Sequence, residues 1–151
     1  MNFDDIKLPV GMAGNVDHIG IAVENLEDSI KLYKGLLGLE LDGIEEVPRE
    51  KVRVAFLRLN NASGIGHIEL LEPMDPDSNI GRFIERKGAG LHHVAFAAAN
   101  MDKALADCRD AGLRMLSDEP MSGAHGKQVM FMHPKSTGGV LIEICADGPS
   151  E

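Results

Sequence analysis

The chain has 151 residues and a mass of 16.3 kDa, enough for one compact domain but too little for two ordinary ones. Its net charge of −9 and pI near 5.1, without any block rich in lysine and arginine, exclude a general nucleic-acid binder. The opening residues lack the pattern of a signal peptide, and no apolar run approaches the roughly 20 residues of a membrane span. We therefore expect a cytoplasmic protein with no membrane partner.

The first predicted strand covers residues 16–23, where the side chains alternate between two faces. His18 falls on the face of Gly20, whereas Asp17 falls on the opposite face. A helix with Asn25 as its predicted N-cap follows. Three more strands are expected, near 39–47, 52–59 and 67–72. A connector then carries a short helix, capped by Ser78 and ended by glycines.

The same pattern returns after the connector. His93 lines up with His18 and, after one deletion, Phe56 lines up with Met130 and Glu69 with Glu143. The second half repeats a helix capped by Asn100, and its later strands are expected near 113–117, 128–132 and 140–145. The sequence thus predicts an α+β fold in which two tandem βαβββ modules form a metal-binding, half-barrel-like mixed sheet.

The repeat also sets the expected domain organisation. Residues 1–14 form an N-terminal extension, 15–146 a single domain and 147–151 a C-terminal tail. Within the domain, we place the first module at 15–72, the linker at 73–89 and the second module at 90–146.

Four polar side chains interrupt the predicted strands at matching positions. His18 and His93 share their faces with small residues, while Glu69 and Glu143 are flanked by isoleucine and leucine. An unpaired buried carboxylate costs several kcal/mol, so each glutamate needs a partner. Two imidazoles and two carboxylates suit Co²⁺, Mn²⁺, Ni²⁺, Fe²⁺ or Zn²⁺ and leave coordination positions for a substrate. Ordinary structural roles could explain one such residue, but four in symmetric register favour a metal site.

Other polar residues have weaker patterns. His67 shares the parity of Glu69 but repeats as a leucine, and His92 is predicted to point away from His93 in a structural role. Glu45 and Glu46 are expected at a solvent-facing strand edge.

Two glycine-rich loops carry further candidates. The segment SGAHGK holds His125 and Lys127, and HPKSTGG holds His133 and Lys135; all four could bind a ligand or be solvated turn residues. The two cysteines, Cys108 and Cys145, show no metal or disulfide spacing and are expected to be buried thiols.

The segments VDHIGIAV, IELLEP, GLHHVAF and GVLIEI, in this order, resemble the vicinal oxygen chelate superfamily and, within it, the methylmalonyl-CoA epimerase family. The resemblance implies that His18, Glu69, His93 and Glu143 bind one divalent ion, with Co²⁺ expected before Mn²⁺, Ni²⁺ or Zn²⁺, and that the chain forms a homodimer. Family members can carry a glutamate, proposed as a base, at the position of Val54. That role is therefore not transferred to this chain.

The resemblance also implies an activity, the interconversion of (R)- and (S)-methylmalonyl-CoA by metal-assisted removal and return of the C2 proton. Glu143 is the expected catalytic group on one face of the enolate, and Lys127 and Lys135 are expected to contact the thioester or the phosphates of an acyl-CoA substrate. The alternatives are a glyoxalase-type lyase or isomerase acting on a glutathione hemithioacetal, and a metal-free binding module of the same fold.

Overall fold

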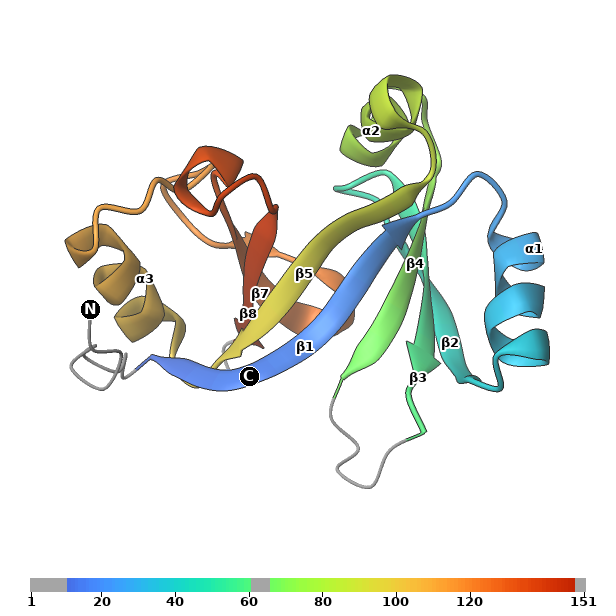
Figure 1. Cartoon of the computed structure of the whole chain (residues 1–151), viewed down its shortest axis with the longest axis horizontal. Coiled ribbons are helices and arrows are strands. Elements are labelled where there is room, and N and C mark those ends of the chain that lie inside the picture. Colours follow the sequence, from blue (N-terminus) through green and yellow to red (C-terminus); the bar gives the residue numbers. More distant parts are fainter. Residues whose placement is uncertain (1–10, 61–65, 149–151) are drawn as a thin grey trace.

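The computed structural model describes residues 11–60 and 66–148 and shows one curled, eight-stranded sheet (Figure 1). The strand order is β2-β3-β4-β1-β5-β8-β7-β6. The strands are β1 (Met12–Ala22), β2 (Glu40–Val47), β3 (Val52–Arg58), β4 (His67–Pro73), β5 (Gly90–Ala98), β6 (Met121–Ser122), β7 (Lys127–Met132) and β8 (Ile142–Asp147). The helices are α1 (Leu26–Ile30), continued by a π-helical turn (Lys31–Leu36), α2 (Asn79–Lys87) and α3 (Met101–Asp110), with 3-10 turns at Ala124–Gly126 and Pro134–Ser136.

The predicted fold of two βαβββ modules is confirmed. The first strands of the two modules, β1 and β5, pair antiparallel in the centre of the sheet and run side by side through the middle of Figure 1. Each then pairs in parallel with the last strand of its own module, β1 with β4 and β5 with β8. The predicted caps are also present, since Asn25, Ser78 and Asn100 each accept a backbone N–H bond in the first turn of a helix.

The central strand begins earlier than the expected module boundary. Gly11 and Met12 lie within the expected N-terminal extension, but β1 starts at Met12, which pairs with Ala98 and packs against the core beside α3. Residues 1–10 of that extension and 149–151 of the expected tail lie outside the described residues. The folded unit therefore includes the last residues assigned to the extension.

The predicted strand at 113–117 is wrong. Within this segment only Met115 forms a bridge, to Met132, and the second strand of the module is the short β6. The segment does lie alongside β7, because the N–H of Leu116 donates to the carbonyl of Phe131 and the N–H of His133 donates to the carbonyl of Arg114. The N–H of Arg114, however, bonds to the Ser136 hydroxyl, which interrupts a regular ladder.

The predicted equivalence of Phe56 and Met130 is wrong by one residue. Phe56 lies opposite Glu69, and it is Phe131 that lies opposite Glu143. Phe131 precedes its partner Glu143 by 143 − 131 = 12 residues, whereas Phe56 precedes Glu69 by 69 − 56 = 13. Met130 instead points to the other face, where it is fully buried against α3.

Each module has its own core on the back of the sheet. In the first module Leu26 of α1 packs with Leu57 and Leu70 of the sheet, and in the second Leu105 of α3 packs with Ile144. Since α1 and α3 cover the backs of the two half-sheets at opposite ends of the molecule (Figure 1), the inner faces are left for a cavity. None of the described helices is long and apolar enough to cross a membrane.

The helix cap of the second module gives a testable prediction. The Asn100 side chain accepts a bond from the N–H of Lys103 at 2.9 Å, which satisfies a free donor in the first turn of α3. We expect Asn100→Ala to lower the free energy of unfolding by about 1 kcal/mol, and Asn100→Ser to lower it much less. Urea unfolding of the two variants measures the difference; equal stability of both with the parent chain would contradict the capping role.

Candidate metal and substrate site

The four predicted metal ligands gather at the floor of a cavity of about 770 Å³ on the inner faces of the two modules. They come from four neighbouring strands, His18 from β1, Glu69 from β4, His93 from β5 and Glu143 from β8. All four side chains are buried, with residue exposures between 4% and 7%. The structure thus brings together all four residues that the sequence repeat selected.

Small residues opposite each ligand make this convergence possible. Gly20 is the ladder partner of both Glu69 and His93, and Ala95 is the partner of both His18 and Glu143. A β-carbon added at Gly20 would lie 2.2 Å from Cε1 of His93. The His93 ring therefore occupies the space that any larger residue at position 20 would need.

Three donor atoms face one another across the junction between the modules. Nε2 of His18 lies 3.0 Å from Nε2 of His93 and 3.0 Å from Oε2 of Glu143, and the last two atoms are 3.7 Å apart. Among the buried side-chain atoms of the described chain, this Glu143 oxygen is the one that makes no hydrogen bond of acceptable geometry. Such an atom is costly unless a cation lies beside it.

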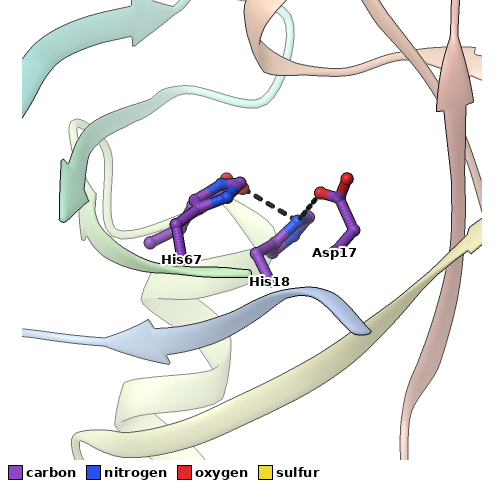
Figure 2. Close-up of side chains that lie close together, drawn as sticks. Asp17, His18 and His67 are labelled. Atoms are coloured by element: carbon purple, nitrogen blue, oxygen red, sulfur yellow. Dashed lines mark hydrogen bonds and ion pairs between the residues drawn. The ribbon is translucent and has the colours of Figure 1, made fainter. Parts of the chain in front are cut away.

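Glu69 approaches the other nitrogen of the same imidazole. Its Oε2 lies 2.9 Å from Nδ1 of His18 and 2.8 Å from Nε2 of His67. The Asp17 carboxylate points to the same Nδ1 at 2.7 Å, as Figure 2 shows with His67 alongside. The four predicted ligands therefore surround the His18 ring, with Glu143 and His93 on one edge and Glu69 on the other.

Within this cluster, the protonated imidazole of His18 carries the positive charge. Burial alone would lower the pKa of His18, but the adjacent carboxylates of Asp17, Glu143 and Glu69 raise the pKa to about 11. Burial would raise the pKa of Glu69, but His18 and His67 lower it to about 2. Burial raises the pKa of the Glu143 carboxyl and lowers the pKa of His93 to about 3. The carboxylates thus require a positive charge in their midst.

Two groups of donor atoms in the cluster could each hold a divalent metal ion, and both include His18. Asp17, His18, His67 and Glu69 form one group of donor atoms close enough to share an ion, and His18, Glu143 and Cys145 form another. The unbonded Glu143 oxygen and the proton held on His18 are the features that an added cation would satisfy and replace. Two imidazoles with carboxylates form a donor set suited to borderline divalent ions.

Asp17 and His92 were assigned to the wrong side of their strands, and β-bulges are the reason. The β1–β5 register shifts between Val16 and His18, and again where Gly20 pairs with His93 but Ile21 pairs with Leu91. The second shift leaves His92 as an extra residue, so that its Nδ1 lies 2.8 Å from Nδ1 of His93. The two bulges thus turn the side chains of Asp17 and His92 toward the cavity, although strict alternation placed them on the other face.

His67, for which the repeat gave little support, also lies at the site through its bond to Glu69. Its parity with Glu69 was the signal that could have selected it, because residues two apart on a strand share a face. Cys108 and Cys145 are buried free thiols, as predicted.

The cavity has a partly basic wall. Lys127 lines it and pairs with Asp147, and Arg82 and Arg86 of α2 line it from the other side. Lys135 is not among the lining residues; it belongs to the turn at Pro134–Ser136, where its backbone N–H bonds to His133. Of the two predicted lysines, Lys127 reaches the cavity. Arg82 and Arg86 were not predicted, and the basic last turn of α2 was a signal for Arg86.

Comparison with known proteins shows close relatives. The family described as Glyoxalase/Bleomycin resistance protein/Dioxygenase superfamily matches residues 17–131. The mitochondrial methylmalonyl-CoA epimerase of Mus musculus is 39% identical over 90% of this chain and 75% of its own length. The ethylmalonyl-CoA/methylmalonyl-CoA epimerase of Cereibacter sphaeroides is 38% identical over 88% of this chain and 98% of its own length.

A solved structure extends the likeness to three dimensions. A variant of the Streptomyces coelicolor methylmalonyl-CoA epimerase in complex with 2-nitronate-propionyl-CoA superposes with a TM-score of 0.84 at 39% identity. The match covers 91% of this chain and 96% of that one.

The glycine beneath His93 provides a direct test of metal binding. We expect Gly20→Ala to displace the His93 ring and to weaken Co²⁺ binding by about tenfold or more, as loss of a correctly oriented ligand does. Gly43→Ala is the matched control, because a β-carbon at Gly43 in strand β2 would meet no atom within 4 Å. Calorimetric titration of both variants with Co²⁺ measures the effect, and unchanged affinity in Gly20→Ala would exclude His93 as a ligand.

Proposed function

Because this chain belongs to the glyoxalase, bleomycin resistance protein and dioxygenase superfamily, and within it to the methylmalonyl-CoA epimerase family, we propose that it interconverts (R)- and (S)-methylmalonyl-CoA. The observation that carries the proposal is the unbonded, buried Glu143 carboxylate oxygen beside two imidazoles, at the floor of a cavity with cationic side chains in its wall. This combination suits an anionic acyl thioester whose C2 proton must be removed and returned.

We propose His18, Glu69, His93 and Glu143 as the residues that hold the divalent ion. When bound, such an ion supplies Lewis-acid stabilisation of the negative charge that develops on the enolate. Burial of the four side chains keeps the site poor in water, where such electrostatic effects are strongest. Asp17 orients the His18 imidazole through Nδ1, and His92 does the same for His93.

We assign to Glu143 the proton transfer on one face of C2. A carboxylate has two oxygens, so one can face the ion while the other takes the proton, and the Glu143 carboxylate comes from β8 at the edge of the donor cluster. Lys127 is proposed to bind an anionic part of the acyl-CoA substrate, together with Arg82 and Arg86. Lys135 could do so only from outside the cavity wall described above.

The homodimer, the cytoplasmic location and the preference for Co²⁺ over other divalent ions stay predictions from the sequence.

The activity itself is tested by proton exchange. We expect chelator-treated protein in D₂O to leave the C2 proton of methylmalonyl-CoA in place, and added Co²⁺ to restore both deuterium exchange and racemisation, followed by proton NMR. No exchange by protein that demonstrably binds Co²⁺ would overturn the epimerase proposal. Product formation from methylglyoxal and glutathione would then favour the glyoxalase-type alternative.

The role of Glu143 is tested by removing its basicity while keeping its shape. We expect Glu143→Gln to lower the epimerisation rate about 10²- to 10⁴-fold, as loss of a general base does. Co²⁺ binding, measured on the same preparation, separates the proton-transfer role from loss of the ion. Epimerisation at the parent rate with metal bound would rule out the assignment.

A further inference from the structure

Inversion at C2 requires a proton-transfer group on each face of the enolate, and Glu143 supplies only one. The first module contributes Val52, Val54 and Phe56 of β3 to the cavity wall, and none of these can transfer a proton. The second group must therefore come from another element that lines the cavity.

Most titratable side chains of the cavity already have another role in the structure. Asp17, His67 and His92 each contact one of the four metal-site residues, Lys127 pairs with Asp147, and burial raises the pKa of the Cys145 thiol far above neutrality. Glu50, Asp77, Glu85 and His125 line the cavity from turns and from α2, and of these four described residues His125 is the one whose ring stacks on the β3 wall, at Phe56. Among the described lining residues this leaves the imidazole of His125.

His125 crosses from the second module onto the wall of the first. It lies in the turn Ala124–Gly126, and its ring stacks on Phe56 with centroids 3.7 Å apart and an angle of 22° between the planes. Phe56 is the ladder partner of Glu69. His125 therefore covers the first-module side of the cavity, whereas Glu143 belongs to the second-module sheet.

Glu45 holds His125 in this position. Its Oε2 accepts the backbone N–H of His125 at 3.2 Å and lies 3.6 Å from Nε2 of the same residue. Glu45 is the ladder partner of Val54 and so projects from the same face of the sheet as the cavity wall. The expected solvent-facing role of Glu45 is thus wrong, because this carboxylate is half-buried and joins the two modules.

The backbone of His125 is strained, with φ of 55° in the left-handed region. A residue other than glycine is disfavoured there and is retained only where its surroundings hold it. Here the bond to Glu45 and the stack on Phe56 hold it. A side chain kept at such a cost at a cavity wall is a candidate for function.

We propose that His125 is the second proton-transfer group of the epimerase, positioned by Glu45, an inference that rests on the proposed function. In one direction Glu143 takes the C2 proton, leaving the enolate, and the His125 imidazolium gives its proton to the opposite face of C2. Glu143 is then protonated and His125 neutral. In the other direction the two roles exchange, and the His125 side chain, 54% exposed, can exchange its proton with water.

The test separates exchange from inversion, using the metal-loaded protein in D₂O with each methylmalonyl-CoA epimer. His125→Asn suits the left-handed backbone, because asparagine tolerates positive φ. We expect it to lower epimerisation at least about a hundredfold. The epimer whose C2 proton faces Glu143 should still exchange deuterium without inversion. Equal loss of exchange for both epimers, or unchanged epimerisation, would overturn the proposal.

Wild-type protein in the same experiment distinguishes failure of the proposed epimerase function from failure of the role proposed for His125. Absence of exchange by the wild type would overturn the proposed function, whereas an active wild type with an unaffected His125→Asn variant would overturn only the role of His125. Should His125→Asn fold poorly in thermal unfolding, His125→Gln gives the same two outcomes, because glutamine also removes the proton-transferring ring.

Glu45→Gln tests the positioning role, since the amide still accepts the backbone N–H but has no charge to pair with the imidazole. We expect kcat for epimerisation to fall about tenfold with KM unchanged. Glu46→Gln is the matched control, because Glu46 is the exposed neighbour on the other face of β2. A parallel rise in KM, or equal effects of the two variants, would contradict positioning by Glu45.

Discussion

The pairing of Gly20 with His93 at the centre of the sheet is the constraint on which the site depends. It fixes the register of β1 against β5, and thereby the distance between the two modules. Because the glycine has no side chain, the His93 ring can lie over it and bring Nε2 to 3.0 Å from Nε2 of His18. One missing β-carbon thus lets two half-sheets, each with its own core, share a single polar cluster.

The charges of that cluster are only partly balanced by His18. Carboxylates from three strands, those of Glu69 and Glu143 buried, converge on the His18 imidazole and raise its pKa to about 11. The unbonded oxygen of Glu143 shows that the balance is incomplete without a further cation. The same imbalance suits the proposed chemistry, since a site that attracts positive charge also stabilises an enolate once the ion is in place.

The two modules have diverged in what they place around the cluster. The first contributes a β3 wall without acid or base, and the second contributes the turn of His125 that covers it. Proton transfer from opposite walls of one cavity would then require both modules. Neither half could then perform inversion alone, although each has the βαβββ pattern.

Much of this protein could be predicted from the sequence. Alternation along the strands, the caps at Asn25, Ser78 and Asn100, and the repeat itself are local or pairwise patterns, and they predicted the fold and selected the four buried polar residues of the cluster. Residues 113–117 were wrongly predicted as a strand. Their residue types favour a strand, but the pairing with β7 is interrupted where Arg114 donates its N–H to the Ser136 hydroxyl.

Tertiary structure alone decided which further residues reach the cavity. The bulges that turn Asp17 and His92 inward exist only where β1 meets β5, so strict alternation misplaced both side chains. The contact between Glu45 and His125 joins residues 80 positions apart in the chain, through a turn whose direction no local pattern specifies. Local periodicity thus determined the elements and the ligand set, whereas the meeting of the two modules decided what surrounds the site, because register shifts and loop crossings are set by packing between distant segments.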